Sequence, residues 1–485
     1  MLLPSAFEER MRTLLGEEYP AFLSAMQEDH AVKGLRVNRH KLSPSHFYDA
    51  GVFSVQPIPY AEEGFYLPEG VEAGKHPYHH AGAYYLQDPG AMATAAALGR
   101  ARLEGDGLRV LDLCSAPGGK TTQVAAMIEE KGGIVLSNEY NAKRSRILAG
   151  NVERMGLTNV CVTNLDTACF PRFYPGYFDI VIADAPCSGE GMFRKNDRAI
   201  EEWSVDNVLM CRDRQREILH NAAGCVAPGG YLLYSTCTYA VEENEETVAA
   251  FLRDHADFSL VPVDPSVIAM TADGIAFDGC EIGNITDCRR FYPHRSPGEG
   301  QFVALMQRSP DAPPPQIEKR KGGKPQKGGR PTSPQEPIPL PPLDKKDEND
   351  LRKTLQELFP AEGLTLGLCG GNVVSFSCSG REFLIPPFGV VACGVAIGEW
   401  RKGRLIPHHH LFSAYGASFY RRVTLSPSGE AIEAYLGGEE IDTSAEVRGI
   451  VAVTLSLGDR EIALGGGKAS DGRLKNYYPK GLRMH

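Results

Sequence analysis

Two cysteines lie where their thiols could take part in a reaction. Cys187 stands in the segment Asp184–Gly189, and Cys237 stands in the segment Ser235–Tyr239. Each follows a short apolar run that is typical of a buried strand and precedes small polar or glycine residues that are typical of a turn. Because ligands bind at the carboxyl ends of strands in an open α/β sheet, we expect both thiols to face one cleft.

A loop of small residues indicates a cofactor site beside these thiols. The run Ser115-Ala116-Pro117-Gly118-Gly119-Lys120-Thr121 follows a predicted strand over 108–114 and opens a helix predicted over 121–130. Glycine lets the backbone approach a ligand closely. The loop lacks the Gly-x-Gly-x-x-Gly pattern of dinucleotide sites, and Cys114 stands where a phosphate-binding P-loop would have its first glycine. The loop therefore predicts neither a dinucleotide nor a nucleoside triphosphate.

Acidic residues at the ends of the next strands favour S-adenosylmethionine as the ligand. Glu139 ends the second predicted strand, where a carboxylate can accept hydrogen bonds from the ribose hydroxyls of an adenosine ligand. Asp166 follows the third strand, where it could accept from the adenine amino group, and Asp184 follows the fourth. Each acid alone is more often a cap or a surface charge. Their joint placement with the small-residue loop is what predicts S-adenosylmethionine.

Two thiols beside a methyl donor suit methylation of a pyrimidine ring carbon. A thiolate that adds to carbon 6 of cytosine makes carbon 5 nucleophilic enough to take a methyl group, after which a base removes the hydrogen at carbon 5 and the thiol is expelled. A free thiol has a pKa of about 8.5, so the attacking cysteine needs help to ionise. Asp184 could hydrogen-bond ring nitrogen 3 or the exocyclic amine as the thiolate adds. The residues alone do not decide which thiol attacks.

The remaining cysteines are expected to be structural, because buried free cysteine is common and usually inert. This interpretation covers Cys114, Cys161, Cys169, Cys211, Cys225, Cys280, Cys288, Cys369, Cys378 and Cys393.

The composition bounds the class of protein. A chain of 485 residues is long enough for roughly two to four domains. No apolar stretch approaches the roughly 20 residues that span a bilayer, and charged residues from Glu8 onward come too soon for a secretory signal. We therefore expect a cytoplasmic protein with reduced thiols and without a metal site. The net charge of −10 argues only weakly against a nucleic-acid partner, because binding depends on local basic patches.

The chain divides into four predicted segments. Residues 1–95 predict an α+β lead-in, and residues 96–308 alternate strand and helix patterns that end in an antiparallel hairpin over 289–305. This alternation predicts a parallel sheet covered on both faces. Residues 309–347 form a proline-rich basic linker, and residues 348–485 begin with a helix and become β-rich.

Three basic segments are each open to two interpretations. Arg36, Arg39, His40 and Lys41 belong either to a solvated strand edge or to a face that contacts phosphates. The linker is either merely solvated or a nonspecific RNA tether, through Lys319, Arg320, Lys321, Lys324, Lys327 and Arg330. The tail over 472–483 interleaves basic and aromatic residues, which predicts either RNA contact with base stacking or an ordinary polar loop.

Several motifs together resemble those of a known family. They are Cys114–Thr121, Asp184–Gly191 and Ser235–Thr238, with Asn38, Lys41 and Gln87–Pro89 as weaker matches. The chain resembles the Sun and nucleolar-protein family of RNA 5-methylcytosine methyltransferases over most of residues 1–308. Its C-terminal part, which ends in Arg473–Arg483, resembles the bacterial RsmF-type branch, which acts on small-subunit ribosomal RNA.

The resemblance implies a role for each site residue. It implies that Cys237 is the nucleophile, that Cys187 assists product release, and that Asp184 and Lys120 belong to the catalytic site. It also implies a cofactor site and a substrate contact by Arg144. The implied cofactor residues are Ser115, Ala116, Pro117, Gly118, Gly119, Lys120, Thr121, Glu139, Asp166 and Asp184.

The resemblance also implies the architecture and the partner. We expect an α/β fold: a Rossmann-like S-adenosylmethionine-dependent methyltransferase sheet, an N-terminal α+β RNA-binding domain and a C-terminal β-rich, PUA-like RNA-binding region. The expected partner of this monomer is ribosomal RNA or the small ribosomal subunit, with no membrane or metal. Two alternatives stay open: a transfer-RNA cytosine-5 methyltransferase and a non-catalytic ribosome assembly factor. The sequence does not name the target cytosine.

Overall fold

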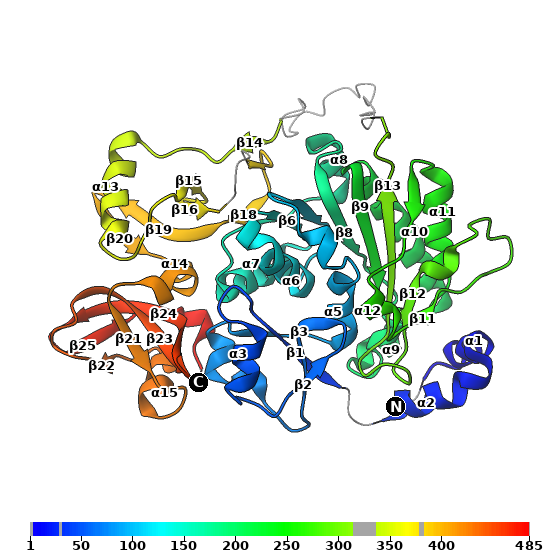
Figure 1. Cartoon of the computed structure of the whole chain (residues 1–485), viewed down its shortest axis with the longest axis horizontal. Helices are drawn as coiled ribbons and strands as arrows, with labels where there is room; N and C mark the ends of the chain where they lie inside the picture. The colour runs from blue at the N-terminus through cyan, green and yellow to red at the C-terminus, as the bar shows by residue number, and fades with distance from the viewer. Residues whose placement is uncertain (1–2, 29–31, 314–335, 378–382, 485) are drawn as a thin grey trace.

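The computed structural model describes residues 3–28, 32–313, 336–377 and 383–484. Figure 1 shows a central mixed sheet with the N-terminal sheet below it and a β-rich C-terminal region to one side. The predicted basic linker residues from Lys319 to Arg330, and Cys378, lie outside the described residues. In the part of the chain that the structure describes, no helix is long and apolar enough to cross a membrane.

The central sheet carries the strand ends from which the site is built. Its strand order is β11-β12-β13-β9-β8-β5-β6-β7-β18, with β10 beside β13. The middle strands β9, β8, β5, β6 and β7 run parallel, and β13 and β18 are antiparallel to their neighbours. The bounds are β5 Arg109–Asp112, β6 Ile134–Asn138, β7 Val160–Thr163, β8 Phe178–Asp184, β9 Val226–Thr236, β10 Phe258–Leu260, β11 Ala272–Asp273, β12 Arg289–Phe291 and β13 Gln301–Arg308. The hairpin predicted over 289–305 is confirmed as β12 and β13.

Helices cover both faces of this sheet, which explains its continuous apolar strands. Neighbouring residues alternate between two cores: Leu111 and Leu136 face one, and Val110 and Val135 face the other. Helices α8, α10 and α11 pack into the first core, and α5, α6, α7 and α12 pack into the second. Their bounds are α5 Pro89–Ala96, α6 Gly119–Ile128, α7 Ala142–Met155, α8 Phe170–Phe173, α9 Asp197–Glu202, α10 Val205–Ala223, α11 Glu245–Asp254 and α12 Pro265–Ile268.

The order of the strands places a crevice beside β5. Strand β5 lies between β6 and β8, so the chain moves to one side of β5 first and to the other side later. The loops that follow β5 and β8 therefore emerge next to each other at the carboxyl ends of the strands. Such a switch point is where open α/β sheets bind ligands.

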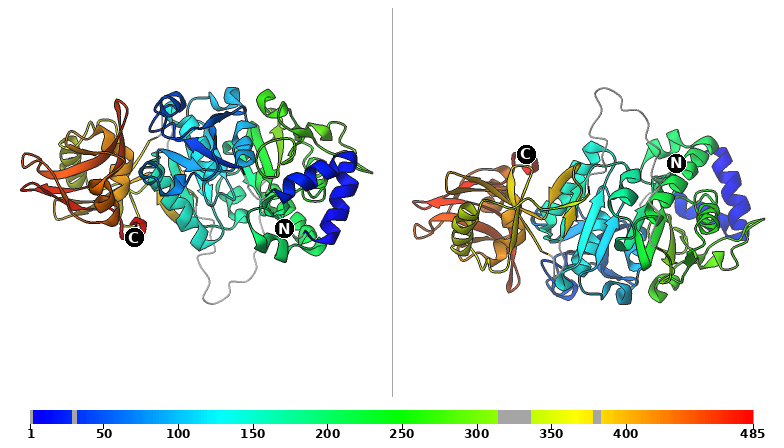
Figure 2. Two further views of the ribbon diagram at one scale, coloured as in Figure 1. Left: turned by 90° about the horizontal axis from the view of Figure 1, so that it is seen from below. Right: turned by 90° about the horizontal axis from the view of Figure 1, so that it is seen from above.

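The N-terminal region packs in two places. Helices α1 and α2 lie beside the far end of the central sheet (Figures 1 and 2), where Phe7 and Phe22 contact Trp203 and Tyr239. A four-stranded sheet of order β2-β3-β1-β4 lies nearer the C-terminal region. The bounds are α1 Ser5–Leu15, α2 Tyr19–Gln27, β1 Lys33–Val37, α3 Pro44–Asp49, β2 Gln56–Ile58, β3 Ala61–Leu67, α4 Pro77–His80 and β4 Tyr84–Leu86.

Residues 36–41 were predicted to form either a solvated strand edge or a face that contacts phosphates. Both predictions are wrong for Arg36 and Lys41. Arg36 is 1% exposed and donates to Gln87, Gly119 and Thr122. The ammonium of Lys41 donates to backbone carbonyls from three parts of the chain, at Ala81, Arg154 and Ala463. These cations are therefore engaged inside the protein, because backbone and amide oxygens that packing removes from water need donors.

The C-terminal region shares structure with the rest of the chain. Strand β18 pairs with β7 and covers that edge of the central sheet, and one core joins residues of the N-terminal sheet to β21–β25. The bounds are β14 Ile338–Pro339, α13 Lys345–Gln356, β15 Thr365–Cys369, β16 Asn372–Phe376, β17 Leu384–Ile385, β18 Val390–Cys393, β19 Val395–Arg401, β20 Arg404–Pro407, α14 His409–Tyr415, β21 Arg422–Leu425, α15 Glu430–Gly437, β22 Ile441–Asp442, β23 Gly449–Leu457, β24 Arg460–Ser470 and β25 Arg473–Asn476.

The tail departs in part from the predicted stacking surface. Tyr478 is 2% exposed and packs against Tyr435 and His409. Its ring therefore completes the core under β24 and cannot stack on a base. Tyr477 is only half-buried, and Arg473 pairs loosely with acidic neighbours at the surface.

Candidate active site

The two thiols meet at the ends of neighbouring parallel strands. Asp184 of β8 and Ser235 of β9 stand opposite each other in register, so the residues just beyond them emerge side by side. The sulfur atoms of Cys187 and Cys237 are 3.2 Å apart, and the backbone N–H of Cys237 donates to the Cys187 sulfur at 3.3 Å. The structure thus brings together the two cysteines that the strand pattern placed at one edge.

The contact with Cys237 changes the acidity of the Cys187 thiol. The hydrogen bond to Cys237, and then burial, raise the pKa of Cys187 well above its ordinary value. Cys187 is therefore a protonated thiol at neutral pH. It can donate a hydrogen bond to the Cys237 sulfur while it accepts one from the Cys237 backbone.

An ion pair lies beside the thiols. The Lys120 ammonium donates to one oxygen of Asp184 at 2.7 Å, and the Ser235 hydroxyl donates to the other oxygen at 2.7 Å. Burial opposes the charge on Lys120, but Asp184 and, more weakly, Cys237 outweigh burial and raise the pKa of Lys120. Lys120 is therefore a charged ammonium that is bound to the Asp184 carboxylate.

The small-residue loop is held through its carbonyl groups. Arg144 donates to the carbonyl of Ala116 at 2.6 Å, Asn151 to that of Pro117 at 2.9 Å, and Arg36 to that of Gly119 at 3.2 Å. Helix α6 begins at Gly119, and no side chain caps its first turn. The N–H groups of that turn are thus left for an anionic group.

Gly118 is required at the start of this helix. Its φ of +113° lies in the region that favours glycine, and an added Cβ would come 2.9 Å from Leu148 Cδ1. The loop therefore packs closely on α7, which carries Arg144 and Asn151.

Comparison with known proteins identifies the family of the chain. Family models match residues 103–307 (16S rRNA methyltransferase RsmB/F), 3–89 (N-terminal domain of 16S rRNA methyltransferase RsmF) and 422–484 (methyltransferase RsmF PUA domain). The chain is 30% identical to ribosomal RNA small subunit methyltransferase F of Erwinia tasmaniensis over 508 residues, which cover 99% of this chain and 97% of the relative. The chain belongs to the RsmF family of 16S rRNA methyltransferases.

Other relatives agree with the RsmF assignment. The relative of the same name from Citrobacter koseri is 31% identical over 99% of this chain and 96% of its own. A crystal structure of a methyltransferase homologue from Pyrococcus horikoshii is 26% identical, has a TM-score of 0.54 and covers 63% of this chain and 95% of that one. NSun6 from the same organism, solved with SFG, has a TM-score of 0.52 at 22% identity over 63% of this chain and 98% of that one, and shows the fold.

The cofactor of this RsmF-family enzyme is S-adenosylmethionine, and the residues fit it. The loop and the start of α6 have N–H groups that suit the carboxylate of S-adenosylmethionine. Glu139 follows β6 and Asp166 follows β7, and their predicted roles as acceptors for ribose and adenine stay predictions. Glu139 is 5% exposed, with one oxygen accepting from Asn141 at 2.8 Å and the other 3.5 Å from Arg144. Asp166 is exposed and has one oxygen on the N–H of Ala168, which leaves the other for a ligand.

Arg144 contacts the small-residue loop and Glu139 in the structure, and the predicted substrate contact stays a prediction.

One further residue, Asp112, was missed by sequence reasoning. It ends β5 beneath the loop, accepts from Thr121 at 2.7 Å and keeps its other oxygen without a partner. Burial raises the pKa of Asp112 to about 6. Its position at a strand end next to the loop was the available signal.

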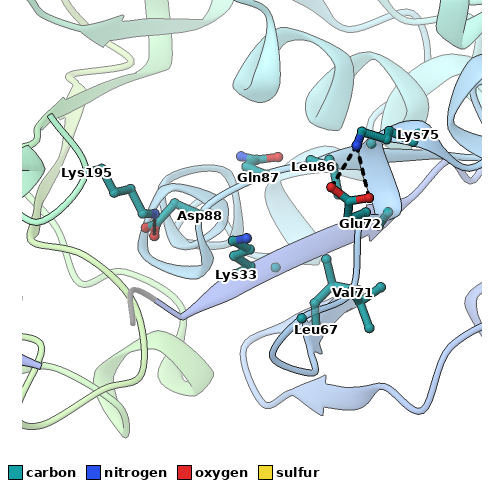
Figure 3. Close-up of a pocket in the computed structure, with 13 residues that line it drawn as sticks. Lys33, Leu67, Val71, Glu72, Lys75, Leu86, Gln87, Asp88 and Lys195 are labelled. Carbon is teal, nitrogen blue, oxygen red and sulfur yellow. Dashed lines mark hydrogen bonds and ion pairs between the residues drawn. The ribbon is translucent and has the colours of Figure 1, made fainter. Parts of the chain in front are cut away.

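A groove lies near the small-residue loop, and Figure 3 shows side chains that line it. It has a volume of about 590 Å³, and Gln87, which packs against Gly119, lines one wall. Three lysines from different parts of the chain line it, Lys33, Lys75 and Lys195. Lys75 pairs with Glu72 and Lys195 with Asp88, whereas no ion pair or hydrogen bond of Lys33 is seen among the residues the structure describes.

Among the residues that the structure describes, no group of three or more His, Cys, Asp or Glu could hold a metal ion.

Proposed function

We propose that this enzyme methylates carbon 5 of cytosine in small-subunit ribosomal RNA through a covalent adduct of Cys237 with carbon 6. The observation that carries the proposal is the 3.2 Å contact between Cys237 and Cys187 beside the Lys120–Asp184 pair. The names of the relatives and the match to a PUA domain support ribosomal RNA as the substrate. The lysines of the groove in Figure 3 suit an RNA backbone.

The residues divide the reaction between them. Cys237, as a thiolate, forms a bond from sulfur to carbon 6, and the electron pair of the ring double bond moves toward carbon 5. The positive charge of Lys120 stabilises the thiolate, and Asp184 holds the ring through nitrogen 3 or the exocyclic amine. S-adenosylmethionine, when bound, supplies an electrophilic methyl group to carbon 5.

Release restores the aromatic ring. A base removes the proton from carbon 5, the electron pair of that bond re-forms the double bond, and the bond between carbon 6 and the Cys237 sulfur breaks. Cys187, which its raised pKa keeps protonated, donates a hydrogen bond to the departing sulfur and stabilises the charge that develops there. The net change replaces the hydrogen at carbon 5 by a methyl group, leaves S-adenosylhomocysteine in place of S-adenosylmethionine and releases one proton.

The test measures methyl transfer and adduct formation together. Labelled S-adenosylmethionine is offered with naked 16S ribosomal RNA, assembled small subunits or transfer RNA. The proposal expects transfer to a cytosine of ribosomal RNA or the subunit, loss of transfer in Cys237→Ser, and an RNA-bound band on denaturing gels in Cys187→Ser. Preferred transfer to transfer RNA would overturn the substrate, and full activity of Cys237→Ser would overturn the nucleophile. A cytoplasmic monomer is part of the same proposal, and sedimentation of the active enzyme checks the oligomeric state.

A further inference from the structure

Two buried polar side chains form hydrogen bonds with the backbone of the turn that carries Cys187. Gln215 of α10 donates to the carbonyl of Pro186 at 3.0 Å and to a carboxylate oxygen of Glu243 at 2.7 Å. The same oxygen of Glu243 accepts from the backbone N–H of Ser188 at 3.0 Å. The residues immediately before and after Cys187 are thus held by two side chains from different parts of the chain.

The pair is unusual for a protein interior. Both side chains are fully buried, and among the described residues Glu243 forms no ion pair. Oε1 of Glu243 and Oε1 of Gln215 have no hydrogen-bond partner. Burying such groups is unfavourable for folding. A placement that destabilises the core therefore points to a function at the one element that both side chains contact.

Cys237 is held by further contacts, in part from Glu190 and Gly191 of the segment that also carries Cys187. Glu190 accepts from the Thr238 hydroxyl and from the N–H of Tyr239, each at 2.8 Å. Asn244 donates to the Thr238 carbonyl at 2.9 Å, and the N–H of Gly191 donates to the Cys237 carbonyl at 2.9 Å. None of these contacts is made by the side chain of Gln215 or Glu243, and the Ser188 hydroxyl, 2.9 Å from the Thr238 hydroxyl, links the two segments. A change at Gln215 or Glu243 therefore acts first on the backbone beside Cys187.

We propose that Gln215 and Glu243 are positioning residues that keep the Cys187 thiol against the Cys237 sulfur, and that they serve release of the methylated RNA more than attack on it. This inference rests on the proposed function, in which Cys187 acts at release. A loosened turn lengthens the contact between the two sulfur atoms, so the adduct forms normally and breaks down slowly.

The test separates attack from release in single-turnover reactions on ribosomal RNA. Gln215→Met keeps the volume but removes both hydrogen bonds of the amide. Glu243→Asp shortens the side chain and draws the carboxylate away from Ser188. Each is expected to form adduct within about twofold of the wild-type rate and to release product about tenfold more slowly, a factor that corresponds to about 1.4 kcal/mol. Glu243→Gln, which keeps an acceptor for the Ser188 N–H, is expected to restore most of the release rate.

Two controls make the outcomes distinct. Glu242→Gln changes the neighbouring acid, whose carboxylate pairs with Arg10 at 2.6 Å, and should leave both rates unchanged. Cys187→Ser sets the maximum accumulation of adduct. If Cys187→Ser accumulates no adduct, the proposed function fails. If it does, but Gln215→Met and Glu243→Asp slow attack and release equally or leave both unchanged, the positioning role is overturned.

Discussion

Replacing Arg36 by methionine tests whether this arginine supports the cofactor loop or contacts RNA. The guanidinium donates to Gln87 Oε1 at 2.9 Å, to the Gly119 carbonyl at 3.2 Å and to the Thr122 hydroxyl at 2.6 Å. Methionine keeps much of the length of the side chain but none of the donors. We expect Arg36→Met to destabilise the fold and to weaken S-adenosylmethionine binding, because Gly119 begins the helix whose N–H groups face the cofactor.

The size of the effect follows from two opposing contributions. Hydrogen bonds to a charged group stabilise by about 1.5–3 kcal/mol each, so the three contribute about 4.5–9 kcal/mol. Burial lowers the pKa of Arg36 from 12.5 to about 10, and relief of that burial returns about 3 kcal/mol. The expected net loss is therefore about 1.5–6 kcal/mol in the free energy of unfolding, with a central value of about 4 kcal/mol.

The assay combines denaturant unfolding with calorimetric titration of S-adenosylmethionine. Arg39→Met is the matched control, because its partly exposed guanidinium pairs with the exposed Glu62 and only distantly with Glu63 and should contribute under about 1 kcal/mol. A different result would refute the reasoning. If Arg36→Met kept its stability and cofactor affinity but lowered RNA affinity and reduced the salt slope by about 1, Arg36 would be a phosphate contact.

Three further outcomes are expected. Lys41→Met removes the donor shared by the Ala81, Arg154 and Ala463 carbonyls. The variant should lower the free energy of unfolding by about 2 kcal/mol and speed proteolysis near residue 463. Unchanged proteolysis would contradict this role of Lys41. Burial raises the pKa of Glu243 from 4.5 to about 7, so the folded chain holds a proton there that the unfolded chain releases. The free energy of unfolding should then fall as pH rises from about 4.5 to 7, by up to about 3 kcal/mol, and Glu243→Gln should flatten that fall in denaturant titrations. Lys33→Glu should raise KM for ribosomal RNA and leave kcat unchanged; an unchanged KM would exclude the groove as the RNA path.

The sequence predicted those parts of the molecule that depend on local pattern. The strand runs before Asp184 and Ser235 had the right length and apolarity, and parallel register then brought Cys187 and Cys237 together. The small-residue loop was recognisable because it joins a strand pattern directly to a helix pattern. Small residues at such a junction let the backbone come close to a ligand. In each case the decisive information lay within about ten consecutive residues.

Features that depend on packing between distant segments were not predicted. Arg36 looked exposed because its strand alternates like an edge strand, but the segment packs against the cofactor loop and is buried. Tyr478 was predicted to stack on a base because basic residues surround it in the sequence. In the fold its ring is buried against Tyr435. Gln215 and Glu243 meet across 28 residues of sequence, and neither belongs to a pattern that indicates a buried amide–carboxyl contact.

The covalent role of Cys237 is tested most directly by mapping where RNA is attached. Cys187→Ser is allowed to react with ribosomal RNA and S-adenosylmethionine, the complex is digested with protease and ribonuclease, and the modified peptide is sequenced by mass spectrometry. We predict a methylated cytidine nucleotide joined to Cys237, and none when Cys237 is also replaced by serine. A nucleotide joined to any other residue, or methylated RNA produced by the double variant, would contradict the account.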